Sequence, residues 1–236
     1  MAPDRDRRAQ LRAGLARSRE AVAAACREAG RDPEAVRLIV VTKHFPTSDA
    51  AALVEDGQTD LGENRDQEAA AKAAALAERG LEPAWHFVGQ LQRNKARSVA
   101  GYAQWVHSVD RLRLADALDA AAAARGRTLN ALIQVNLDGG ASRGGVLTAD
   151  LPALAERVAA AGSLRLKGVM AVAPIDWEPA KAFALLAECS EAVRAVEPGA
   201  VEISAGMSGD FAAAVAAGAT MVRLGRNVLG EREPMA

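Results

Sequence analysis

Lys43 follows the apolar, β-branched run Leu38–Val41, which is typical of a strand buried on both faces. An apolar strand beside a lysine favours the neutral amine, and the neutral amine is the form that attacks an aldehyde. Position alone also fits an ordinary surface lysine at a strand end. The chemistry of Lys43 therefore depends on which other groups the fold brings close to it.

Two glycine-containing turns near the end of the chain have the features of a phosphate site. The first is Ser204–Asp210 (SAGMSGD), before a predicted helix, and the second is Arg223–Asn227 (RLGRN), at the end of the last predicted strand. Backbone amides at such turns bind anions. In a barrel of alternating strands and helices, the loops after strands seven and eight usually hold a phosphate. Arg223 could serve that ligand or form a salt bridge at the barrel rim.

Asn64 and His86 are two further polar residues in or just after predicted strands. Asn64 could hydrogen-bond a ligand ring, or it could cap the helix that follows. His86 could act on a ligand, but a single histidine inside a strand is more often a hydrogen-bonded core residue. We therefore predict a core position for His86.

The elements that would position these residues alternate along the chain, after a long amphipathic helix over about Asp4–Gly30. The predicted strands are Val36–Val41, Thr59–Leu61, Ala84–Val88, Trp105–Val109, Leu129–Leu137, Leu166–Ala171, Val201–Ser204 and Met221–Leu224. The predicted helices between them are Ser48–Asp56, Arg65–Arg79, Arg93–Ala100, Arg111–Arg125, Leu151–Ala161, Pro179–Val196 and Phe211–Ala217.

Eight strands separated by helices predict a single (β/α)8 barrel of the TIM type with an extra N-terminal helix. The connections are short and no Ser/Gly linker interrupts them, so we predict one domain over residues 1–236. Ligand groups gather at the carboxyl ends of barrel strands. Lys43, Asn64 and both glycine-containing turns fall at such ends.

The composition argues against several classes of protein. There are 29 basic and 30 acidic residues, so no excess positive charge points to nucleic acid or an anionic membrane. The basic run Arg5–Arg12 is interpreted as the solvated face of the first helix. No segment approaches the ~18 consecutive apolar residues of a membrane span, and no apolar leader is apparent. We therefore expect a cytoplasmic protein.

Other site chemistry finds no support in the motifs. Cys26 and Cys189 fall in helical patterns without metal-ligand spacing, so we expect reduced core thiols. The sequence has no P-loop motif, no set of residues with recognisable metal spacing and no Ser-His-Asp arrangement.

Several motifs occur together and in order along nearly the whole chain. They are VVTK (Val40–Lys43), LGENR (Leu61–Arg65), WHFVGQLQRNK (Trp85–Lys95), KGVM (Lys167–Met170), SAGMSGD (Ser204–Asp210) and VRLG (Val222–Gly225). On these motifs the sequence strongly resembles the pyridoxal phosphate homeostasis protein family. The eleven-residue segment that begins at Trp85 is the most specific of them.

The resemblance implies a barrel like the N-terminal domain of alanine racemase, with pyridoxal 5′-phosphate (PLP) held as a Schiff base on Lys43. It implies that Arg223 faces the pyridine nitrogen. A guanidinium there disfavours protonation of the ring, and an unprotonated ring is a weaker electron sink. The other cofactor-binding residues that it implies are Asn64, Met207, Ser208, Gly225 and Arg226.

The resemblance also implies a role in vitamin B6 balance, in which the protein holds PLP and hands it over without catalytic turnover. PLP-dependent apo-enzymes are the expected recipients, and a monomer is expected. The alternative is a racemase-like PLP enzyme. A racemase needs a second domain with a catalytic tyrosine, for which little sequence follows Glu233. The one tyrosine, Tyr102, lies between a predicted helix and strand, at the wrong face of the barrel.

Two departures from the family pattern concern binding. Arg226 stands where the family usually has Thr, so a hydroxyl to the phosphate is lost, although a cation could replace it. In the loop Asp138–Gly145, Gly140 replaces the usual Glu and Arg143 the usual Lys. Because arginine forms no Schiff base, we expect no secondary PLP attachment in this loop.

Overall fold

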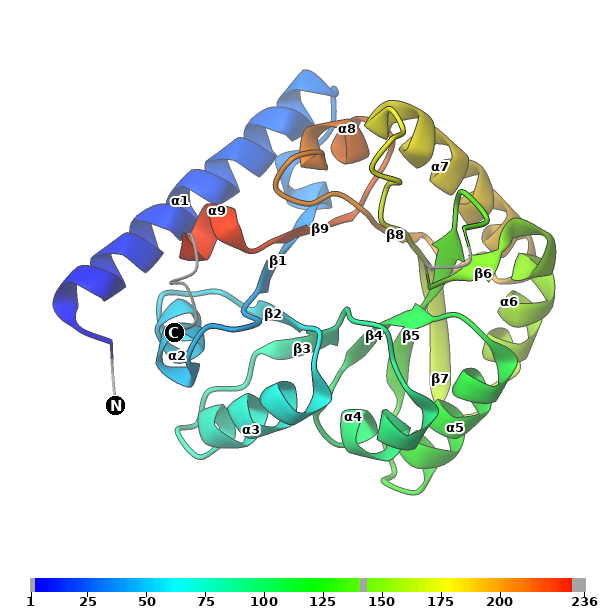
Figure 1. Ribbon diagram of the computed structural model, residues 1–236, viewed down its shortest axis with the longest axis horizontal. Coiled ribbons are helices and arrows are strands. Elements are labelled where there is room, and N and C mark those ends of the chain that lie inside the picture. The colour runs from blue at the N-terminus through cyan, green and yellow to red at the C-terminus, as the bar shows by residue number, and fades with distance from the viewer. Residues whose placement is uncertain (1–2, 141–143, 231–236) are drawn as a thin grey trace.

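The computed structural model describes residues 3–140 and 144–230, and within them eight parallel strands close into a barrel (Figure 1). The order around the ring is β1, β2, β3, β4, β5, β7, β8 and β9, and β9 pairs back with β1. The barrel strands are β1 Arg37–Val41, β2 Asp60–Glu63, β3 Ala84–Phe87, β4 Trp105–Val109, β5 Leu129–Asn136, β7 Leu164–Met170, β8 Glu202–Ser204 and β9 Met221–Leu224. A two-residue strand, β6 (Val146–Leu147), pairs with β5 at the barrel mouth.

Helices cover the outer face of the barrel (Figure 1). The α-helices are α1 Arg5–Glu28, α2 Thr47–Glu55, α3 Asp66–Ala77, α4 Ala96–Tyr102, α5 Leu112–Ala123, α6 Leu151–Ala159, α7 Pro179–Val196, α8 Phe211–Ala216 and α9 Arg226–Leu229. Short 3₁₀ helices lie at η1 Pro33–Ala35, η2 Arg93–Lys95 and η3 Thr148–Asp150.

The predicted barrel with its extra N-terminal helix is confirmed. β6 and α9 were not predicted, because two and four residues are too few for a periodic pattern. The helix predicted over Arg93–Ala100 is wrong in form: it begins as the 3₁₀ helix η2 and continues as α4 through Tyr102. Other boundaries differ from the predicted ones by up to two residues, as fraying ends do.

Strand alternation sorts side chains between the barrel lumen and the layer under the helices. The lumen core consists of Ile39, Trp105, Leu132, Met170 and Met221, contributed by five different strands. Val106, next to Trp105, instead packs into the helix–sheet layer. The lumen is thus a packed core below the mouth and not a channel.

Helix α1 completes the outer ring where α9 is too short to do so, and it packs against α8, α9 and α2 (Figure 1). Gly14 allows this approach, since a Cβ there would lie 2.1 Å from the carbonyl oxygen of Val228. The interpretation of the basic run on α1 as a purely solvated face is wrong, because three of its arginines form ion pairs. Arg7 pairs with Asp49 at 2.6 Å, and Arg8 and Arg12 pair with acidic residues at the end of α2.

Two simpler expectations concern the cysteines and the membrane. Cys26 and Cys189 are both free and buried, as predicted. None of the helices in residues 3–140 and 144–230 combines the length and apolar character needed to cross a bilayer.

We predict that Gly14→Ala destabilises the protein by about 1–3 kcal/mol, the usual range for overpacking. Alanine gains about 1 kcal/mol in helix propensity, so a net loss would show that the contact with α9 dominates. Chemical denaturation would measure the change. Gly162→Ala is the control, because a Cβ at this exposed position meets nothing within 4 Å. Equal stability of the two variants would contradict the close packing of α1 on α9.

Candidate functional site

Lys43 lies in a tight turn just after β1, at the barrel mouth. The Phe45 amide closes the turn by donating to the Thr42 carbonyl at 3.1 Å. His44, the next residue, has a φ of 66°, in the left-handed region that non-glycine residues rarely adopt. Such strain persists only where surrounding contacts impose it. Contacts from elsewhere in the fold must therefore hold this turn.

The buried Lys72 of α3 holds it. Its ammonium donates to the Thr42 carbonyl at 2.8 Å, to Glu63 Oε1 at 2.6 Å and to Glu68 Oε1 at 2.8 Å. The Thr42 hydroxyl donates to Glu63 at 2.7 Å, and the His44 amide donates to Glu68 at 2.6 Å. Both residues that flank Lys43 are thus fastened to one group of charges, which we call the Lys72 cluster.

Two members of the Lys72 cluster are buried, with Lys72 only 3% and Glu63 0% exposed, whereas the side chain of Glu68 is 24% exposed. Burial raises the pKa of Glu63, although Lys72 and Thr42 oppose the shift. Burial also acts on Glu68, but the bonds from Lys72 and His44 outweigh it and lower its pKa. All three ammonium protons of Lys72 have acceptors, so this buried cation is fully satisfied.

The Gly225 turn lies directly beside the end of β1. In the register of β1 and β9, Ile39 is opposite Arg223 and Val40 is opposite Leu224. A Cβ on Gly225 would lie 3.2 Å from the carbonyl oxygen of Val41, two residues before Lys43. The amides that open α9, those of Arg226 and Asn227, have no partner within that helix.

The Gly206 turn joins the same mouth. Its backbone accepts from the Arg223 amide at 3.0 Å, which ties it to β9. Gly206 has a φ of 87°, and a Cβ there would lie 2.8 Å from Phe211, so the tight turn requires glycine. Ser208 is half-buried here. The Met207 amide donates to Asp210 at 2.6 Å, so the amide of this predicted cofactor residue is already engaged.

Arg223 is buried, with 5% exposure, and points into the barrel interior. Its Nη1 donates to Ser204 Oγ at 2.7 Å and its Nη2 to the Ala171 carbonyl at 2.9 Å. Burial lowers the pKa of Arg223 to about 10, with Asp210 opposing. The alternative of a salt bridge at the rim is wrong, because both acceptors are neutral. Among the described residues no carboxylate lies within 4.0 Å of the guanidinium.

Asn64 follows β2 on the other side of β1. Gly89 allows the loop after β3 to pack on it, since a Cβ on Gly89 would lie 2.3 Å from the Asn64 carbonyl oxygen. The alternative role as a helix cap is wrong, because α3 is capped at Arg65 and by no side chain. Asn64 Oδ1 is buried without a hydrogen-bond partner in the described structure, and the residue lines a cleft of about 490 Å³.

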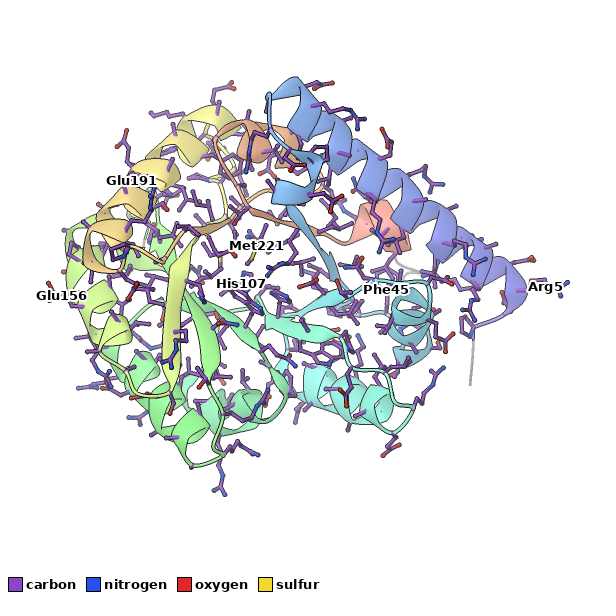
Figure 2. The ribbon with its side chains drawn as sticks, turned by 180° about the vertical axis from the view of Figure 1, so that it is seen from behind. Arg5, Phe45, His107, Glu156, Glu191 and Met221 are labelled. Carbon is purple, nitrogen blue, oxygen red and sulfur yellow. The ribbon has the colours of Figure 1, made fainter. Side chains whose placement is uncertain are left out.

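His86 is a buried core residue, as predicted. Its Nε2 lies 2.9 Å from Asp60, and its Nδ1 lies 2.9 Å from Nε2 of His107. His107 in turn lies 2.9 Å from Ser204, the residue that accepts from Arg223. Figure 2 shows His107 directed into the barrel interior, near Met221. Burial lowers the pKa of both imidazoles, so both are neutral near pH 7.

His107, and the contact that Ser204 makes with it below the mouth, were not predicted from the sequence. One signal was available, since His107 has the same strand parity as Trp105 and must share its face of β4. Parity does not show which strand lies across the lumen. Ser204, 97 residues further along the chain, could therefore not have been named as its partner.

We predicted that Tyr102 lies between a helix and a strand, but it is the last residue of α4. It packs against both hydrophobic clusters of the helix–sheet layer, outside the lumen. Burial, followed by the nearby Asp66, raises the pKa of its hydroxyl. Gly140 is held by Asn136 and Asp138, whereas Arg143 lies outside the described residues.

Comparison with known proteins agrees with this geometry. The family model described as alanine racemase, N-terminal domain, matches residues 50–233. A pyridoxal phosphate homeostasis protein of Mycobacterium tuberculosis is 43% identical over 245 residues, covering 96% of this chain and 95% of the relative. The chain belongs to the pyridoxal phosphate homeostasis protein family.

Solved structures extend the comparison. PipY of Synechococcus elongatus, in a structure with PLP bound, superposes with a TM-score of 0.81 at 33% identity, over 93% of this chain and 100% of that one. Alanine racemase of Corynebacterium glutamicum superposes with a TM-score of 0.69 at 16% identity, over 94% of this chain but 60% of the racemase. The second match shows a shared barrel fold.

We predict that Lys72→Met destabilises the protein by about 3–5 kcal/mol near neutral pH, because it leaves the buried Glu63 carboxyl without its cationic partner. Urea denaturation would measure the loss. The double variant Lys72→Met/Glu63→Gln should recover part of it, since the unpaired carboxyl is then gone. Lys95→Met, at a more exposed lysine, serves as the control. If the free energy of unfolding of the single variant fell by less than about 1 kcal/mol, the Lys72 cluster would not contribute to stability as proposed.

Proposed function

We propose that this chain binds PLP at the barrel mouth through a Schiff base with Lys43, and that it holds and delivers the cofactor for vitamin B6 homeostasis. One observation carries the proposal: the turn that bears Lys43 lies directly beside the Gly225 turn. An amine for the aldehyde and amides for the phosphate of one small molecule are therefore presented together. The structure of the relative PipY with PLP bound supports this assignment.

The remaining groups at the mouth fit the parts of PLP. Arg223 uses two of its five N–H donors within the protein, which leaves others for the ring nitrogen. Asn64 Oδ1 is a buried acceptor that lacks a partner in the described structure. We assign the phosphate to Ser208, the Gly225 turn and Arg226. Met207, with its amide engaged by Asp210, contributes its exposed side chain at the rim.

The environment of these residues favours holding PLP over using it in a catalytic cycle. PLP supplies an electrophilic aldehyde and, when its ring is protonated, an electron sink. Arg223 presents a donor to the ring nitrogen, which keeps that nitrogen unprotonated and the sink weak. The Lys72 cluster fixes the backbone on both sides of Lys43, so the residue that bears the amine is held in place before PLP arrives.

A racemase-like activity is the alternative. It requires acid–base groups on both faces of the substrate carbon. Tyr102 cannot be the second one, because it lies in the helix–sheet layer. We expect no robust interconversion of D- and L-amino acids by the PLP-loaded protein in steady-state assays. Robust turnover would overturn the proposal that the protein only holds the cofactor.

The proposal extends to the setting in which the protein works. We propose that residues 1–236 form a single domain and that the protein is a monomer in the cytoplasm. PLP-dependent apo-enzymes are the proposed recipients of the cofactor. The near-neutral net charge of −1 supports exchange with proteins over binding to nucleic acid or anionic membranes.

We predict that Lys43→Ala abolishes covalent PLP while cooperative unfolding is retained, because one side chain at the rim contributes little to the core. Borohydride reduction followed by mass spectrometry would detect the trapped adduct in the wild type and its absence in the variant. Lys181→Ala, a lysine of α7 that lies over Trp177, is the matched control and should trap PLP normally. An adduct of full yield in Lys43→Ala would contradict the assignment.

We also predict that Arg226→Thr leaves PLP affinity unchanged or tightens it by up to roughly tenfold, since it restores a hydroxyl at the opening of α9. Equilibrium dialysis would measure the dissociation constant. Asn227→Thr, at the next exposed position, controls for a general effect on α9. Clear weakening in Arg226→Thr would show that the arginine itself is a phosphate ligand here.

A further inference from the structure

A continuous line of hydrogen bonds crosses the barrel interior and ends on Arg223. From Asp60, the first residue of β2, it passes through His86, His107 and Ser204, with successive distances of 2.9, 2.9 and 2.9 Å. The last link is the 2.7 Å bond from Arg223 Nη1 to Ser204 Oγ. We call these five residues the polar chain. They come from five strands, and apart from Asp60, whose side chain is 13% exposed, they are buried.

The chemistry of the two ends fixes the direction of every bond. The carboxylate of Asp60 only accepts, so His86 carries its proton on Nε2. The other nitrogen of a neutral His86 then accepts from Nε2 of His107. The other nitrogen of His107 accepts from the Ser204 hydroxyl. That hydroxyl has one proton, already used, so it offers only lone pairs to Arg223.

Every donor in the polar chain therefore points away from Arg223 and toward Asp60. Aligned hydrogen bonds polarise one another, and here their negative ends face the guanidinium while their positive ends face the carboxylate. Arg223 thus gains support from a distant carboxylate without a direct ion pair. Its two acceptors, Ser204 and Ala171, are neutral and occupy one N–H donor each, which leaves three of its five donors.

We propose that Asp60, His86, His107 and Ser204 are positioning residues that hold the Arg223 guanidinium toward the ring nitrogen of bound PLP. This inference rests on the proposed function. None of the four needs to contact the cofactor, because they act by fixing the one orientation of the Ser204 hydroxyl that accepts from Arg223. Asp60 sits at the amino end of β2, whereas Lys43 lies past the carboxyl end of β1, so the control is exerted from the opposite end of the barrel.

The test compares PLP with 1-deaza-PLP, the analogue in which a C–H replaces the ring nitrogen. Ser204→Ala removes the acceptor, and Asp60→Asn removes the charge that sets the direction. Both should weaken PLP binding, by roughly tenfold for Ser204→Ala and less for Asp60→Asn, because a hydrogen bond to a charged group is lost or loosened. Neither should change the affinity for the analogue. Asp116→Asn, on α5, removes an equal but exposed charge and is the control.

A measurement on the cofactor-free protein tests the polar chain itself. The ¹⁵N chemical shifts of the imidazoles should show His86 and His107 as neutral, with the proton on Nε2 in both. Asp60→Asn should mix the two forms. His44→Gln removes the signal of the third histidine and completes the assignment. The proposal would be overturned if either histidine were a positively charged imidazolium, or if either neutral ring carried its proton on Nδ1.

The binding outcomes are also decisive. Equal weakening of PLP and 1-deaza-PLP, or no weakening of either, would show that the polar chain only stabilises the fold. Ser204→Thr, which keeps the hydroxyl, should bind PLP like the wild type and guards against an unfolded alanine variant. A wild type that bound neither compound would contradict the proposed function. A wild type that bound both, with unaffected variants, would overturn this inference alone.

Discussion

The pairing of β1 with a strand on each side is the constraint on which the site depends. Val40 pairs with Leu61 of β2, and Ile39 pairs with Arg223 of β9. The end of β1 is therefore fixed between the second strand and the last strand of the barrel. Closure of a parallel ring requires all carboxyl ends to open at one mouth. The turn that bears Lys43 is thereby placed between Asn64 and the Gly225 turn. A shift of one residue in this register would turn Arg223 out of the lumen.

Two buried cations beside this pairing are accommodated in different ways. Lys72 forms ion pairs with two carboxylates and donates to the Thr42 carbonyl, so its charge is neutralised within the protein. Arg223 has only neutral acceptors, and burial lowers its pKa to about 10. A buried charge without a direct ion pair is costly for the fold. The proposed role of Arg223 at the ring nitrogen of PLP would account for this cost.

Family membership and geometry lead to the same view of the chemistry. The barrel is shared with alanine racemase at the level of the fold, and fold alone does not carry an activity. The mouth of this chain combines three features. An amine lies on a clamped turn, a guanidinium faces inward, and the one tyrosine is committed to the layer under the helices. These features fit the proposed binding of PLP at the mouth.

The sequence by itself determined the alternation of strands and helices, and with it the barrel. Hydrophobic periodicity and glycine turns are local signals, so they also placed Lys43, Asn64, Ser208 and Gly225 at strand ends. Only the tertiary structure decided which side chains meet. In the sequence, Lys72 has no feature that separates it from an ordinary helix lysine. It is buried against Glu63 only because α3 packs behind β2. His86, His107 and Ser204 lie on three strands, and Ser204 is 97 residues from His107. Parity shows that each faces inward, but contact across the lumen depends on how the ring closes, which no local pattern encodes.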